Sequence, residues 1–305
     1  ASISIPSSIT SIGRFSFFQC TSITELLIPS SVSLIEDSAF KGCSSLKIIN
    51  IPPLIKSIKK TLFSECSSLE TINFDSPSSV TSIGSYAFYK CSSLKYISIP
   101  STVTLIGESS FSECSSLIEI SIPSTVKTIE DSSFEKCISL NHVDLLTKNI
   151  ILIQSSVFKE CSSLIEITIP NSVTSIGYYS FFKCSSLKKV SIPTSVFEIQ
   201  QYAFAECTSL ENIIIPSSVK IIGEYAYYGC KSLAEILIPS SLSEIASHVF
   251  SKCSSLKKVV VPSSVTSICD FAFSDCESLS EITIPSSIIS LGSNSFPSQT
   301  IVTKE

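Results

Sequence analysis

Cysteine recurs along this chain at nearly constant spacing, and no other sequence feature restricts the fold so strongly. Three residues before each of these cysteines lies an aromatic residue, and three residues after it lies leucine, or isoleucine in the first repeat. Aliphatic residues follow at six and eight, and proline usually follows at nine. The spacing is 23 residues, with one gap of 25 and one of 24: Cys20, Cys43, Cys66, Cys91, Cys114, Cys137, Cys161, Cys184, Cys207, Cys230, Cys253 and Cys276.

A single 23-residue turn cannot bury its own apolar side chains. Neighbouring turns must therefore stack, so that each repeated position becomes a continuous column in the core. The pattern predicts a solenoid, mostly β, in one domain over residues 1–305 with about 12 full repeats and partial repeats at both ends.

The composition fits a stacked interior better than a membrane protein. Mean hydropathy is +0.42 and only 15% of residues are charged. However, no apolar run approaches the roughly 18 residues that a membrane-spanning helix needs, so we expect no direct membrane insertion. The net charge of −5 gives no reason to expect a nucleic-acid partner.

Within one repeat, the segment Leu94–Pro100 predicts a short strand. Its alternation turns Ile97 and Ile99 inward and Tyr96 and Ser98 outward, and proline ends the strand because it has no N–H to donate. The following V-x-x-I pattern predicts a second short strand on the opposite face. The S-F-x-x-C piece is too short for a regular helix, so turns or a 3₁₀ segment are expected there.

The repeated pattern, roughly IPxSVxxIGxxAFxxCxxLxxIxI, resembles the BspA-like subclass of leucine-rich repeats from Ile3 to Phe296. The resemblance implies a right-handed solenoid with a parallel sheet on its concave face, short strands opposite and little α-helix. Proteins of this subclass are common on the surfaces of bacteria and parasitic protozoa, where they are associated with adhesion and host-protein binding. That functional link is an analogy at the level of the fold.

The cysteines allow three interpretations. A zinc site needs clustered pairs, whereas the closest two here are Cys269 and Cys276, so no metal is expected. Disulfides between adjacent turns remain an alternative, because equivalent residues there lie about 5 Å apart. We favour a buried column of free thiols that act as small apolar filler. Cys269 stands where other turns carry glycine and is the thiol expected to be reachable.

Catalytic chemistry has little support in the sequence. The two histidines, His142 and His248, lie about a hundred residues apart in a stacked rod. No nucleophile elbow, zinc-protease motif, P-loop or dinucleotide fingerprint occurs. We therefore expect no enzyme and no cofactor.

Two repeats depart from the pattern. Asp75 and Leu146 replace the proline that ends the strand, and both lie in the longer repeats. The extra residues Asp75–Ser76 and the stretch Leu146–Asn149 are expected to bulge from the rim. We favour tolerated insertions, with binding loops as the alternative.

Candidate binding residues come from the outward columns five and seven residues after each cysteine. Column seven is mostly Ser, Thr and Asn but becomes apolar in three consecutive turns, which predicts an exposed stripe that contacts a protein ligand or a second copy of the chain. In column five, Tyr96 and His142 are the strongest individual anchors. The alternatives are β-propensity alone for the stripe and a solvated face for the single residues. The stripe and its neighbours are Ile214, Leu237 and Val260 beside Asn212, Glu235 and Lys258.

Three functions agree with these features. The first is a cell-surface or secreted adhesion or recognition module that binds a protein; the second is a cytoplasmic protein-interaction scaffold; the third is a structural spacer. The chain contains no Met and begins within a repeat, so we expect a fragment or processed form of a longer protein.

Overall fold

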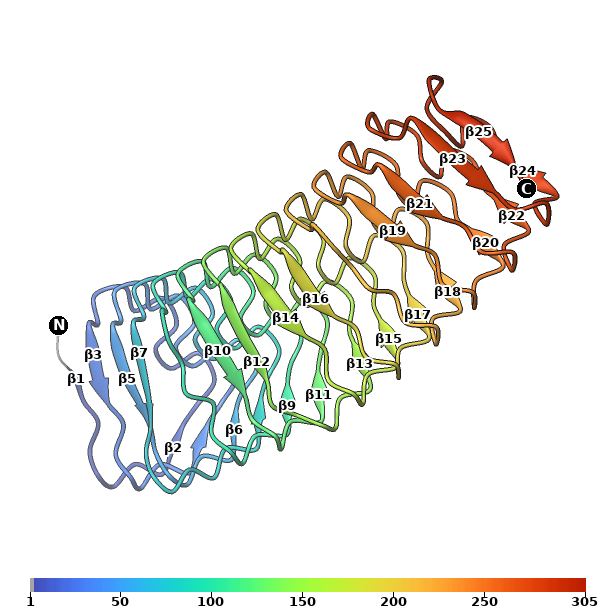
Figure 1. Cartoon of the computed structure of the whole chain (residues 1–305). Helices are drawn as coiled ribbons and strands as arrows, with labels where there is room; N and C mark the ends of the chain where they lie inside the picture. The colour runs from blue at the N-terminus through green and yellow to red at the C-terminus, as the bar shows by residue number, and fades with distance from the viewer. Residues whose placement is uncertain (1–2) are drawn as a thin grey trace. The chain divides into compact units, whose positions relative to one another are not determined.

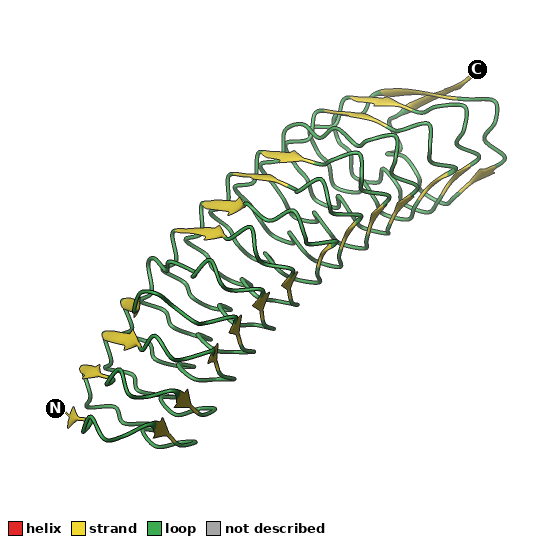
Figure 2. Ribbon diagram, turned by 90° about the horizontal axis from the view of Figure 1, so that it is seen from below, coloured by secondary structure: helices red, strands yellow, loops and turns green. Residues whose placement is uncertain are grey.

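The computed structural model describes residues 3–305, in which strands and turns alternate without any helix (Figure 2). The chain divides into two compact units, Ala1–Ile150 and Ile151–Glu305, here called unit 1 and unit 2. Each unit is an all-β solenoid in which most turns carry one longer and one shorter strand (Figure 1). The solenoid prediction is confirmed, whereas the single domain over residues 1–305 stays a prediction.

In unit 1, the longer strands follow the cysteines and the shorter strands follow the prolines, except that the two-residue β1, which belongs to the longer series, precedes the first cysteine. The longer series is β1 (Ile3–Ser4), β3 (Glu25–Leu27), β5 (Ile48–Ile51), β7 (Thr71–Phe74), β10 (Glu119–Ile122) and β12 (His142–Leu145). The shorter series is β2 (Ser11–Ile12), β4 (Leu34–Ile35), β6 (Ser57–Ile58), β8 (Ser82–Ile83), β9 (Leu105–Ile106) and β11 (Thr128–Ile129).

Unit 2 repeats the same two series. Its longer strands are β14 (Glu166–Thr168), β16 (Lys189–Ser191), β19 (Glu235–Leu237), β21 (Lys258–Val260), β23 (Glu281–Ile284) and β25 (Ile301–Lys304). Its shorter strands are β13 (Leu152–Ile153), β15 (Ser175–Ile176), β17 (Glu198–Ile199), β18 (Ile221–Ile222), β20 (Glu244–Ile245), β22 (Ser267–Ile268) and β24 (Ser290–Leu291).

Paired strands are parallel and join equivalent residues of adjacent turns, as in Glu166 with Lys189. Two longer strands predicted by the repeat are missing: residues 95–100 and 211–215 keep the expected alternation of burial but are not strands. Burial requires only alternating side chains, whereas a strand also requires a hydrogen-bond ladder. At residues 211–215 the contact to the next turn is long, with Ala234 N donating to Glu211 O at 3.4 Å.

The core of each unit is built from single-residue columns. The aromatic residues three positions before each cysteine stack with nearly parallel, offset rings, whose centroids lie 5.1–5.6 Å apart in both units. Offset stacks of this kind are the favoured arrangement of aromatic rings. Tyr227 occupies this column as the one tyrosine, fully buried, and its hydroxyl finds no hydrogen-bond partner within residues 3–305.

The S-F-x-x-C segment folds as consecutive turns, one of the two predicted outcomes. In one repeat, Tyr86, Phe88 and Lys90 each donate a backbone N–H to a carbonyl of the next turn at 2.8–3.0 Å. Tyr86 (φ 57°) and Lys90 (φ 60°) adopt the left-handed region of backbone conformation, which directs their N–H groups toward the next turn. Glycine does so without strain, and Gly229 occupies the position equivalent to Lys90.

Candidate functional site

The solvent side of the longer strands is here called the exposed sheet face. Residues six after each cysteine are buried and those at five are exposed, as the alternation predicts. Residues at eight are buried or half-buried, and those at seven are exposed except for the half-buried Asn50. Because the buried columns repeat in every turn, the outward columns are the part of the sheet that distinguishes one turn from the next.

An apolar cluster interrupts the polar face of unit 2. Ile214, Leu237 and Val260, here called the C-terminal patch, are 84%, 67% and 43% exposed. They line a hollow of about 490 Å³, and Leu237 and Val260 are register partners in β19 and β21. The polar residues that border the same hollow are those expected from the sequence: Asn212, Glu235 and Lys258.

Tyr96 and His142 lie on the exposed sheet face of unit 1, so they belong to a different unit from the C-terminal patch. Tyr96 is 54% exposed. His142 Nε2 lies 3.1 Å from Asp144 Oδ1, two residues along the same strand. The imidazole therefore already has a local partner, which leaves its other ring nitrogen for a ligand.

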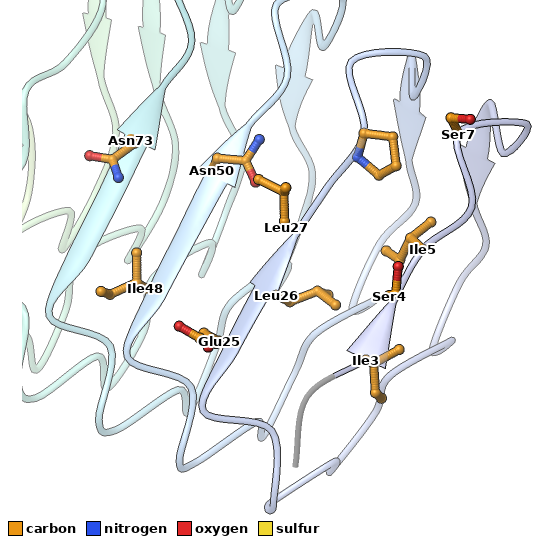
Figure 3. Close-up of a pocket in the computed structure, with 11 residues that line it drawn as sticks. Ile3, Ser4, Ile5, Ser7, Glu25, Leu26, Leu27, Ile48, Asn50 and Asn73 are labelled. Atoms are coloured by element: carbon orange, nitrogen blue, oxygen red, sulfur yellow. The ribbon is translucent and has the colours of Figure 1, made fainter.

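A second apolar cluster on unit 1 was not expected from the sequence. Ile3, Leu27 and Ile48, here called the N-terminal patch, are all exposed and line a hollow of about 510 Å³. Figure 3 shows Leu27, Asn50 and Asn73 in one row across three neighbouring strands. The signal was present in the outward columns, because Leu27 lies seven residues after its cysteine and Ile48 lies five after its own.

A third hollow, of about 520 Å³, runs along the turns of unit 1. The residue before each cysteine alternates in charge there, as Glu65, Lys90, Glu113 and Lys136. Lys90 Nζ lies 3.8 Å from Glu113 Oε2. The hydrogen bond with the Tyr89 hydroxyl and then the charge of Glu113 raise the pKa of Lys90. This edge thus carries no block of like charge.

A row of partly exposed rings follows the turns of unit 2. Tyr179, Tyr202, Tyr225, His248 and Phe271 stack with centroids 4.4–4.8 Å apart. His248 is packed between Tyr225 and Phe271, and both faces of its ring are covered. Within residues 3–305, no three His, Cys, Asp or Glu side chains are grouped to hold a metal ion.

The ladder cysteines face the core and donate to carbonyls. Cys184 Sγ lies 3.1 Å from the Phe158 carbonyl oxygen of the preceding turn, and equivalent bonds recur in both units. Burial raises the pKa of Cys184 well above its usual range and that of Cys276 to about 12. Thiols held protonated in this way are poor nucleophiles.

The second and third ladder thiols, Cys43 and Cys66, influence each other. The side-chain interaction between Cys43 and Cys66 lowers the pKa of Cys43 and raises that of Cys66. The Cys66 thiol itself donates to the Phe40 carbonyl oxygen at 3.1 Å. Besides Cys269, the structure leaves Cys20 partly exposed, which the sequence did not indicate.

The two departing repeats extend their ladders. Where proline is absent, Asp75 N donates to Ile51 O at 3.0 Å and Leu146 N to Ile122 O at 3.2 Å. Of the predicted rim stretch Leu146–Asn149, Thr147 turns inward and is buried, while the other three residues are exposed.

Comparisons with known proteins agree with this architecture. A family model described as "BspA type Leucine rich repeat region (6 copies)" matches residues 1–80, 73–188 and 174–303. No match to a curated protein was found.

Three solved structures share the fold over nearly all of the chain. A leucine-rich repeat protein from Bacteroides ovatus is 28% identical, with a TM-score of 0.71 over 99% of this chain and 82% of its own. A leucine-rich cell surface protein from Faecalibacterium prausnitzii is 27% identical, with a TM-score of 0.63 over 99% and 92%. The pneumococcal vaccine antigen PcpA, 18% identical with a TM-score of 0.51 over 100% and 89%, shows the fold alone.

Residues 3–305 include no helix long and apolar enough to cross a membrane. The three matched ranges of the family model together cover almost all of the chain, and the structure has the β-solenoid that its repeat predicts. The chain therefore belongs to the BspA-type leucine-rich repeat family.

Proposed function

We propose that this chain is a non-enzymatic protein-binding module that works at a cell surface, and that the exposed sheet face of unit 2 contacts its protein ligand. The observation that carries this proposal is the C-terminal patch. Two of its side chains, Ile214 and Leu237, are more than half exposed although the same column is otherwise mostly polar. Contiguous exposed apolar surface with a polar border is typical of protein interaction sites.

The energetics favour occupation of the patch. Burying a large aliphatic side chain stabilises a complex by about 1.5–3 kcal/mol, so the three residues together supply a substantial part of a micromolar affinity. β-propensity alone would explain a branched residue in any one turn. It does not account for three consecutive apolar turns that share one hollow.

Leucine-rich repeat proteins are typically binding modules without enzymatic activity, and the sequence motifs of catalysis are missing here. The surface location rests on one relative, the 27% identical protein that is described as a leucine-rich cell surface protein. An intracellular scaffold with the same fold and a structural spacer are the competing functions. A scaffold would bind cytoplasmic proteins through the same face, and a spacer would bind none.

A double variant, Ile214→Ser with Leu237→Ser, tests the proposed surface. The intact chain is used as bait for membrane-surface and cytoplasmic extracts, captured proteins are identified and purified, and their affinity is measured directly. We expect the double variant to weaken binding of a surface protein by at least about tenfold, because each tenfold step requires only about 1.4 kcal/mol of lost apolar burial. Chemical cross-linking of the complex should join the bound ligand to Lys258.

The matched control is Thr168→Ala with Ser191→Ala, which changes two exposed residues of the same column in the same unit. The control should bind like the unmodified chain. Equal affinities for the unmodified chain and the double variant would refute the proposed surface. Capture of cytoplasmic proteins only would favour the scaffold.

A further inference from the structure

From the order of charges around the C-terminal patch, we infer that this patch pairs with the same patch on a second copy of the chain. The exposed sheet faces of the two copies meet, and a two-fold axis between the faces relates the copies. The axis runs parallel to β19 and β21, over the gap between these two strands. The inference rests on the proposed function, because it names the partner for that same surface.

The register of the two strands provides the starting point. Glu235 pairs with Lys258, and Leu237 pairs with Val260, in adjacent parallel strands. All four side chains point to solvent and border or line the hollow. One face therefore presents a carboxylate beside an ammonium group and, two residues further along both strands, two aliphatic side chains.

A two-fold axis between these strands makes the face complementary to itself. It places Glu235 of one copy opposite Lys258 of the second copy, and the reverse pair forms at the same time. In the next column it places Leu237 opposite Val260 of the second copy. Opposite charges across an interface fix its register, and aliphatic side chains at the centre exclude water.

The charge order excludes the two neighbouring axes. An axis over β19 would place Glu235 opposite Glu235 of the second copy. An axis over β21 would place Lys258 opposite Lys258 of the second copy. Like charges directly opposite each other are destabilising in sheets and at interfaces. Only the axis between the strands converts both contacts into attractive pairs.

The outer neighbours fit the same arrangement. One turn outward on each side, the axis places Asn212 opposite Glu281 and Ile214 opposite Thr283 of the second copy. All four residues are exposed. An amide can donate to the carboxylate of Glu281, and neither pair creates a contact between like charges.

Sedimentation velocity on the intact chain tests the pairing, with E235K, K258E and their mixture as the decisive variants. We expect the unmodified chain to dimerise at chain concentrations up to about 100 µM. Each single variant should weaken dimerisation by at least about tenfold, equivalent to about 1.4 kcal/mol. An equimolar mixture of E235K and K258E should restore dimerisation to within about threefold, because both contacts between the two variants are again of opposite charge.

The mixture separates a specific contact from a loss of folding, since a misfolded variant would not be rescued by another. An unmodified chain that stays monomeric at about 100 µM, single variants that dimerise like it, or a mixture that fails to recover would each overturn the inference. If the chain stays monomeric but the Ile214→Ser, Leu237→Ser double variant binds a different protein ligand more weakly than the unmodified chain does, this inference fails and the proposed function stands.

Discussion

The free energy of unfolding is expected to fall steeply as the pH rises from about 7.5 to about 9.5, because the buried thiols stay protonated in the folded chain. Burial, preceded for Cys66 by its interaction with Cys43, raises the pKa of nine buried ladder thiols, so the folded state keeps their protons above the pH at which the unfolded chain releases them. Their contribution to stability is complete below the unfolded pKa of about 8.5 and is lost as the pH rises toward the folded values. The nine are Cys66, Cys91, Cys114, Cys137, Cys184, Cys207, Cys230, Cys253 and Cys276.

The expected effect is large because the thiols act together. Each one contributes a slope of about 1.4 kcal/mol per pH unit above the unfolded pKa, so nine of them approach a total on the order of 10 kcal/mol per unit. That equals the whole stability of a typical domain. Urea unfolding followed by far-ultraviolet circular dichroism, with a reductant present at each pH, measures the change.

A variant with Cys184→Ala and Cys207→Ala serves as the control. Removing two of the titrating groups should reduce the slope by about 2.8 kcal/mol per pH unit, although the variant starts from a lower stability. Equal urea midpoints at about pH 7.5 and about pH 9.5 would show that these thiols are not held protonated by burial.

Phe181→Ala should cost about 3–5 kcal/mol of unfolding free energy. Its ring is fully buried and lies 5.5 Å from the Phe158 ring and 5.1 Å from the Phe204 ring, centroid to centroid. Truncation leaves a cavity in a continuous column, and neighbouring turns that are pinned by hydrogen bonds cannot collapse to fill it. The urea midpoint of the variant measures the loss.

Two substitutions bracket this expectation. Phe182→Ala, one residue further along, removes a partly exposed ring and should cost much less. Tyr227→Phe, in the same column as Phe181, should instead stabilise the chain by about 1–3 kcal/mol, because it removes a buried hydroxyl without a partner. A loss at Phe182 as large as that at Phe181 would contradict the column as the source of stability.

The sequence predicted the columns because the constraint repeats. A position such as that of Phe181 or Cys184 has the same neighbours above and below in each turn, so its residue type recurs at a fixed spacing and identifies the core directly. The sequence could not predict which turns complete a strand, since residues 95–100 and 211–215 satisfy the same pattern without the hydrogen-bond ladder of a sheet. Ladder hydrogen bonds depend on backbone geometry that no single side chain reveals.

The sequence also predicted part of the candidate binding surface, for a related reason. Ile214, Leu237 and Val260 break a polar column, and a broken column is visible by spacing alone. The N-terminal patch was missed because Leu27 and Ile48 lie in two different columns and join only across neighbouring strands. Partial exposure of Cys20 was also missed, because the repeat gives it the same motif as the buried thiols.

A thiol count on the unreduced chain tests most directly whether the ladder is a structural column of free, buried thiols. In the native state near neutral pH, we expect only Cys20 and Cys269 to react with a thiol reagent at an appreciable rate, because the other sulfurs face the core. After unfolding in denaturant without reductant, all thirteen cysteines should react. A markedly lower count in the unfolded, unreduced chain would mean that disulfides cross-link the turns, and would contradict the column of free thiols.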